Sequence, residues 1–163
     1  MIKTVKSGVR SVAEPHTYLR CAYKISEITT SHQKQKTQMV DLHGDLTVDR
    51  FLFDEAKVTA RGFRDLKHGP AGIDTAHLLV DFTIEYGDPN VLELGQIVPE
   101  NIQDIFFDEY NCIARNDVGF SFQSYISLLD AWYGIPSDPH KRSIPQEIRL
   151  EKILKIAEIG FQL

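Results

Sequence analysis

Cysteine is scarce in this sequence, and long apolar runs are missing. Cys21 and Cys112 are the only two cysteines in 163 residues, and they do not form a C-x-x-C pair. This argues against a disulfide framework or a thiolate zinc site, so both are expected to be buried thiols. No apolar run approaches the roughly 20 residues that cross a bilayer. Because Met1-Ile2-Lys3 does not open a signal peptide, we expect a cytoplasmic protein with no membrane partner.

Motifs that name a reaction are also missing. The chain has no G-x-S-x-G, no Walker loop and no dinucleotide-binding glycine pattern, and neither cysteine lies in a nucleophile motif. The apolar fraction of 42% and the charged fraction of 25% are ordinary for a globular protein. The sequence therefore predicts a single domain over residues 1–163. We expect a binding protein that has no cofactor and is not an enzyme.

Positive charge is absent from the middle of the chain. No lysine or arginine occurs between His68 and Ala114, and from Asp81 to Asp117 nine acidic residues face Arg115 alone. The whole chain carries a formal charge of −5. A concentrated negative field repels nucleic acid and attracts basic surfaces. A basic protein is therefore the expected partner, and a solvated face that only confers solubility is the alternative.

The first 98 residues predict four to six strands. The strongest pattern is Ala76–Tyr86, whose larger apolar residues recur at every second position and are expected to be core: Leu78, Val80, Phe82, Ile84 and Tyr86. Gly87–Asn90 then breaks the run, and Val91–Val98 is the expected partner strand. Further extended segments are expected at Thr17–Ile25, Met39–Val48, Phe51–Phe53 and Lys57–Leu66. Thr17–Ile25 would also suit a helix, and one helical turn is the alternative for Phe51–Phe53. Thr29–Gln38 contains no apolar residue and is expected to be an exposed, mobile connection.

About three helices are expected in the remainder. The first begins at Pro99 and turns Ile102, Ile105 and Phe106 toward the core. The second runs from about Ser121 to Trp132. The third begins with a capping box of Ser143 and Gln146 and ends at Gly160 as its C-cap. Together these patterns predict an α+β fold, in which an antiparallel sheet from the N-terminal half is packed by the C-terminal helices.

Two polar groups are candidates for chemistry. Asp41, His43 and Asp45 would share one face of a strand and offer ligands for zinc, manganese or iron, although ordinary solvent-facing residues show the same pattern. His68 and His77 are candidates for an acid–base pair, with each other or with His43. Arg61-Gly62-Phe63-Arg64 with Lys67 would suit a phosphate, but a solvated hairpin is the commoner origin of such a cluster.

The first predicted helix carries the candidate partner-binding site. Glu100, Asp104 and Asp108 are spaced i, i+4 and i+8, which places their carboxylates in one stripe that Asn111 continues. Phe107 projects about 100° from Phe106, so an exposed aromatic ring is expected beside the carboxylates. Such a surface would hold a basic partner. The alternative is that Phe107 packs inside the protein.

In size, acidity and lack of a catalytic signature, the chain resembles bacterial immunity proteins that neutralise nuclease toxins, including those of contact-dependent inhibition systems. The resemblance lies in overall properties, so no residue role is transferred from it. It implies a cytoplasmic inhibitor that binds a cognate basic toxin and does not bind nucleic acid directly. The alternative function is a small metal-dependent or histidine-based hydrolase or nuclease that uses Asp41, His43 and Asp45.

Overall fold

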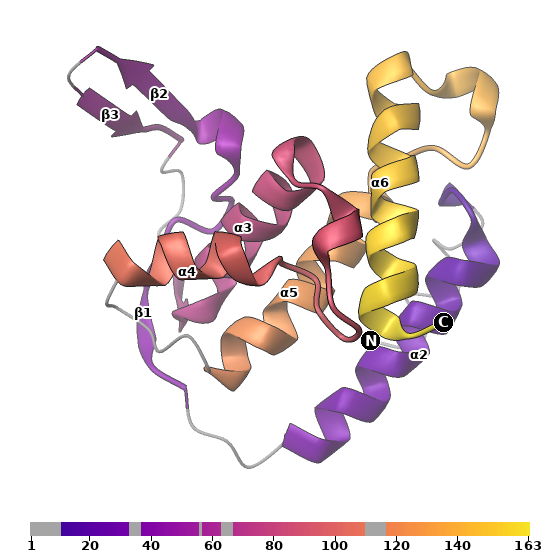
Figure 1. Cartoon of the computed structure of the whole chain (residues 1–163), viewed down its shortest axis with the longest axis horizontal. Helices are drawn as coiled ribbons and strands as arrows, with labels where there is room; N and C mark the ends of the chain where they lie inside the picture. The colour runs from indigo at the N-terminus through magenta and orange to yellow at the C-terminus, as the bar shows by residue number, and fades with distance from the viewer. Residues whose placement is uncertain (1–10, 33–36, 56, 63–66, 110–116) are drawn as a thin grey trace.

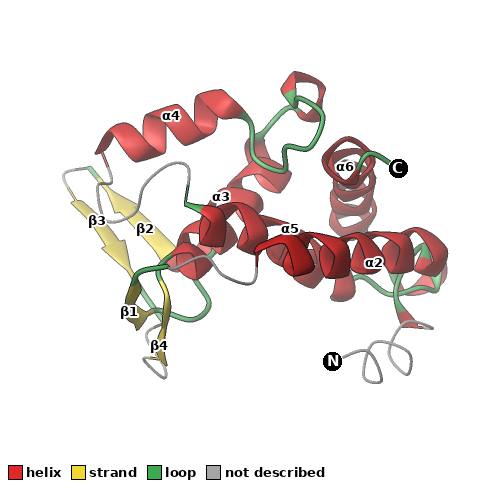
Figure 2. Cartoon of the chain, turned by 90° about the horizontal axis from the view of Figure 1, so that it is seen from below, coloured by secondary structure: helices red, strands yellow, loops and turns green. Residues whose placement is uncertain are grey.

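The protein has an α+β fold, as the sequence predicts. A computed structural model describes residues 11–32, 37–55, 57–62, 67–109 and 117–163. Five α-helices in these ranges form the body: α2 (Pro15–His32), α3 (Gly72–Tyr86), α4 (Glu100–Glu109), α5 (Val118–Tyr133) and α6 (Ile144–Phe161). Figures 1 and 2 place the strands and α4 at one end of the molecule and α6 toward the other.

The strands form two small antiparallel pairs. Strand β1 (Met39–Leu42) pairs with β4 (Lys67–Pro70), and β2 (Phe51–Asp54) pairs with β3 (Lys57–Ala60). The short 3-10 helix η2 (Val48–Arg50) leads into β2, and the β2–β3 hairpin projects away from the helices (Figure 1). These strands confirm extended structure at the start of three predicted segments, but they build two ribbons in place of one sheet.

The prediction of a strand over Ala76–Tyr86 is wrong, because this segment lies in helix α3. The buried residues of α3 recur at helical spacing: Gly72, Thr75, Ala76, Leu79, Val80, Thr83 and Ile84. Phe82 is 39% exposed and Tyr86 is 67% exposed, whereas a strand would bury both. Thr83 is compatible with the core because its hydroxyl donates to the Leu79 carbonyl at 2.7 Å. The two-residue alternation therefore coincides with a helix whose buried face includes threonine and alanine.

Three other predictions for the N-terminal 98 residues are also wrong. Thr17–Ile25 lies in helix α2, which buries Tyr18, Cys21 and Ile25 at spacings of three and four residues. Thr29–His32 is the end of the same helix and not a loop, and 33–36 of the predicted connection lie outside the described residues. Val91–Val98 contains no strand: a 3-10 helix, η3 (Pro89–Val91), is followed by irregular chain that buries Ile97 and Val98.

The core lies where α5 packs against α2, α3 and α6. Trp132 of α5 is fully buried and its indole N–H donates to the Ala13 carbonyl at 2.9 Å. The Tyr18 ring meets Trp132 edge-to-face, with centroids 5.5 Å apart. Helices α3 and α5 cross closely at Gly72, where a Cβ would lie 2.6 Å from the backbone nitrogen of Phe120. A side chain at Gly72 would therefore push the two central helices apart.

The three C-terminal helices confirm the sequence prediction. Asp117 caps α5 by accepting from the Phe120 N–H at 2.9 Å, and Ser143 with Gln146 forms the predicted capping box of α6. The prediction for Gly160 is wrong, because α6 continues to Phe161 and its C-cap is Gln162 in the left-handed conformation. Gly160 is buried, and a Cβ there would lie 2.2 Å from Cδ1 of Ile97. Close packing explains this glycine.

Candidate functional site

Helix α4 presents its carboxylates to the outside. Of the three carboxylates in the predicted stripe, those of Glu100 and Asp108 are exposed and that of Asp104 is half-buried. The opposite side of α4 packs on the protein through Ile102, and the Gln103 amide donates to the Val98 carbonyl at 2.8 Å. Asn111, the fourth polar residue of the predicted stripe, lies outside the described residues.

The apolar residue that stands among these carboxylates is Ile105 and not Phe107. Phe107 is half-buried and meets Phe120 edge-to-face at 5.2 Å, so the expectation of an exposed ring is wrong. Ile105, expected in the core, is 73% exposed. At about 100° per residue, a core face centred between Phe106 and Gln103 takes in Phe107 and turns Ile105 outward. The expected combination of apolar and acidic side chains is therefore present on α4 with a different apolar member.

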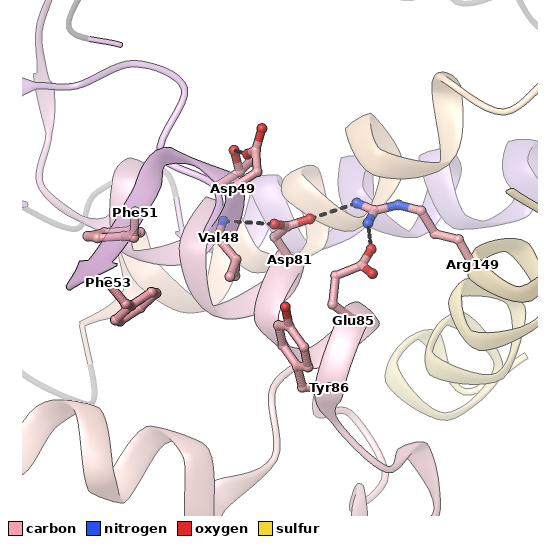
Figure 3. A pocket seen from close by; sticks show the side chains of 9 residues that line it. Val48, Asp49, Phe51, Phe53, Asp81, Glu85, Tyr86 and Arg149 are labelled. Carbon is pink, nitrogen blue, oxygen red and sulfur yellow. Dashed lines mark hydrogen bonds and ion pairs between the residues drawn. The ribbon is translucent and has the colours of Figure 1, made fainter. Parts of the chain in front are cut away.

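A cleft of about 600 Å³ lies at the base of the β2–β3 hairpin, where the hairpin meets α3. Its lining includes three aromatic side chains and three carboxylates: Phe51, Phe53, Tyr86, Asp49, Asp81 and Glu85. Figure 3 shows the rings of Phe53 and Tyr86 on opposite sides of the opening, with the acidic groups beyond them. Arg149 from α6 completes the acidic side.

The acidic side of the cleft is an ion-pair network. The Arg149 guanidinium contacts Asp81 at 2.8 Å and also pairs with Glu85. Asp81 accepts a second hydrogen bond from the Val48 N–H at 2.9 Å (Figure 3). Three carboxylates and one guanidinium leave two formal negative charges without a balancing cation in the lining. The cleft therefore favours a positively charged group.

Helix α3 also anchors the end of β1 and the β2–β3 hairpin. Asp74, in the first turn of α3, accepts hydrogen bonds from the backbone N–H groups of His43 and Gly44, the latter at 2.9 Å. Asp81 lies seven residues further along α3 and accepts from Val48. Seven residues are about two turns of an α-helix, so Asp74 and Asp81 lie on the same face of α3. This acidic face of α3 therefore fixes both the end of β1 and the start of the hairpin.

The candidate metal ligands have separate partners. Asp41 faces His68 across the β1–β4 pair at 3.2 Å, the Asp45 carboxylate pairs with Arg50, and the His43 ring lies 2.9 Å from the Arg61 carbonyl. Within the described ranges, no group of three His, Cys, Asp or Glu side chains gathers as metal ligands do.

The other candidate groups are dispersed as well. His77 lies on α3, outside the ribbon that carries His68. Phe63 and Arg64 of the basic cluster fall outside the described residues. None of the helices in the described ranges combines the length and apolar character that spanning a bilayer requires.

Comparison with known proteins adds no relative. No protein-family model matches the chain, and neither a curated protein nor a solved structure shows significant similarity to it.

The cleft is the feature that sequence patterns miss. Its residues come from η2, β2, α3 and α6, which are separated by up to about one hundred positions along the chain. The one local signal is the spacing of Phe51 and Phe53, because residues two apart in a strand share a face. Nothing in the sequence indicates that Tyr86 lies opposite them.

Proposed function

We propose that this chain is a binding protein for a basic protein, and that the outward face of α4 forms part of the contact surface. The observation that carries the proposal is the exposure of large apolar side chains beside acidic side chains at one end of the molecule. Ile105 is 73% exposed between the carboxylates of α4, and Phe53 and Tyr86 of the nearby cleft are 75% and 67% exposed. Exposed apolar groups with a polar rim are typical of interaction surfaces.

The charge distribution supports a basic partner. The segment from Asp81 to Asp117 contains nine acidic residues and one arginine, and it includes α4 and the acidic side of the cleft. A concentrated field of this kind steers a positively charged protein toward the surface and raises its association rate. It also disfavours direct binding of nucleic acid, whose phosphates carry the same sign.

Within this class, the proposed role is that of an immunity protein. A cytoplasmic immunity protein neutralises a nuclease toxin by covering the basic surface that binds the substrate, with carboxylates taking the place of phosphates. This role needs no catalytic group or cofactor. It fits the resemblance in size and acidity, and it gives the exposed acids of α4 a purpose.

The test uses the basic nuclease domain that the proposal expects to be encoded beside this gene. The wild-type protein should inhibit that nuclease stoichiometrically and protect cells that produce it. The double variant Asp104→Lys/Asp108→Lys should inhibit about tenfold more weakly at low salt, with a smaller difference at high salt.

A matched control separates a local effect from a change in net charge. Glu151→Lys/Glu158→Lys alters the net charge equally at exposed positions of α6, at the other end of the molecule (Figures 1 and 2). The control should retain inhibition and both double variants should remain folded. Equal loss in the two double variants, unchanged inhibition by the α4 variant, or the lack of a neighbouring basic toxin gene would contradict the proposal.

A further inference from the structure

The cleft at the hairpin base leaves two aromatic rings unburied. Phe53 is 75% exposed and Tyr86 is 67% exposed, although both line the same cavity. Figure 3 shows the two rings on different sides of the cleft. The Tyr86 ring contacts the Phe82 ring, with centroids 5.2 Å apart, and the exposed parts of the Phe53 and Tyr86 rings offer negative π faces to a cation that enters the cleft.

The charges of the cleft select a cation. Arg149 is already held by Asp81 and Glu85, so its guanidinium is committed to carboxylates and does not present a free positive charge to an anion. Asp49 is exposed and adds a third carboxylate to the lining. A planar, positively charged ligand could stack on the rings and at the same time donate hydrogen bonds to the carboxylate oxygens.

We infer that the cleft receives an arginine side chain of the partner protein. The guanidinium stacks between Phe53 and Tyr86 and donates hydrogen bonds to the carboxylates of Asp49 and Glu85. Arginine suits the site better than lysine because its planar group combines ring stacking with several donors. The inference rests on the proposed function, since it names the group that a basic partner would insert. The cleft would then be a second contact with the partner, in addition to the outward face of α4.

The cleft is large enough for this occupant. Its volume of about 600 Å³ falls within the range of roughly 300–1,000 Å³ that is usual for ligand sites. The cleft therefore has room for an arginine side chain. The Asp81–Arg149 pair behind the site holds Glu85 in position, because Arg149 contacts both carboxylates.

The test needs no knowledge of the partner. The probe is an acetylated, amidated Gly-Arg-Gly peptide, titrated into the full chain at physiological salt and followed by NMR. We expect a Kd on the order of 1 mM and an upfield shift of the arginine δ-methylene protons, which the two rings would shield. The matched citrulline peptide has nearly the same shape without the charge and should bind more than tenfold more weakly.

Variants of the two exposed rings distinguish stacking from general apolar contact. Phe53→Ala and Phe53→Leu should each weaken the arginine peptide about two- to fivefold, because leucine restores apolar area but no π face. Tyr86→Phe should bind as the wild type does, and Tyr86→Ala should bind like Phe53→Ala. Asp49→Asn should weaken binding further. All these positions are exposed, so the variants should fold.

The outcomes separate this inference from the proposed function. Equal binding of arginine and citrulline peptides, full retention of binding in Phe53→Leu, or shifts at residues away from the cleft would overturn the inference. Binding of the arginine peptide by a chain that inhibits no neighbouring nuclease would leave the cleft as an arginine site and contradict the immunity role. Inhibition that is insensitive to Phe53→Ala and Asp49→Asn would support the immunity role and would show that the cleft does not take part in binding the nuclease.

Discussion

Replacing Asp81 with alanine should destabilise the protein and release the hairpin from α3. The Asp81 side chain is only 13% exposed, and it accepts from Arg149 at 2.8 Å and from the Val48 N–H at 2.9 Å. Hydrogen bonds to charged groups contribute about 1.5–3 kcal/mol each. Arg149 keeps Glu85 as a partner and is partly solvated, so the two losses do not add fully. We expect Asp81→Ala to lower the free energy of unfolding by about 2–4 kcal/mol.

The assay is urea unfolding followed by circular dichroism, combined with amide hydrogen exchange. For a chain of this size the expected loss corresponds to a fall in Tm of about 4–16 °C. The Val48 amide should exchange faster in Asp81→Ala and remain protected in Asp81→Asn, whose amide oxygen still accepts. Glu85→Gln is the control for a more exposed carboxylate at the same guanidinium, with an expected cost below about 1 kcal/mol.

A double-mutant cycle isolates the contact with Arg149. Asp81→Ala and Arg149→Ala should show a coupling energy of about 1–2 kcal/mol, because each single change removes the same ion pair. A loss below about 0.5 kcal/mol for Asp81→Ala, an equal loss for Glu85→Gln, or unchanged exchange at Val48 would refute the account of how α3 holds the hairpin.

Three further predictions concern the fold. Ile84→Ala should lower the free energy of unfolding in urea by about 2–5 kcal/mol and Phe82→Ala by clearly less, because Ile84 is 1% and Phe82 39% exposed. The reverse order would support a strand over Ala76–Tyr86. Burial raises the pKa of Cys21 to about 11, so in a Cys112→Ser background its alkylation at pH 8 should be far slower than that of a free thiol and should rise up to about pH 11; rapid labelling in the folded state would contradict this. Ser143→Ala should cost about 1 kcal/mol through the lost capping box, and an unchanged Tm would show that the cap does not matter.

The C-terminal helices were predictable because their signals are local. Asp117 precedes α5 by one residue, and Ser143 with Gln146 defines the start of α6 within four positions. Side-chain caps of this kind depend on neighbours in sequence, so they can be recognised without knowledge of the tertiary structure.

The sequence pattern of helix α3 differs from that of an ordinary amphipathic helix for a physical reason. Its buried face contains Thr75, Ala76 and Thr83, which hydropathy does not mark as core. Thr83 satisfies its hydroxyl on the helix backbone, so it is buried at little cost. Its exposed face carries Phe82 and Tyr86, which hydropathy marks as core. The apparent alternation therefore arose from aromatic residues that line a surface and polar residues that line the interior.

The candidate site was predictable in part. The carboxylate stripe of α4 follows from helical spacing alone, and the structure exposes Glu100 and Asp108 and half-buries Asp104. The choice between Ile105 and Phe107 depended on the rotation of α4 against α5, which is set by the contact of Phe107 with Phe120. The cleft depends on chain segments brought together by long-range packing, and no local pattern encodes that.

The most direct test of the central claim is the association rate constant with the neighbouring nuclease domain, measured at several ionic strengths. Binding through an acidic surface predicts fast association that slows steeply as salt rises from about 50 to 300 mM, where the Debye length shortens. Asp104→Lys/Asp108→Lys should associate about tenfold more slowly than the wild type at low salt and approach it at high salt. A rate constant that depends neither on salt nor on the charges of α4 would contradict the claim that this protein binds a basic partner through its acidic end.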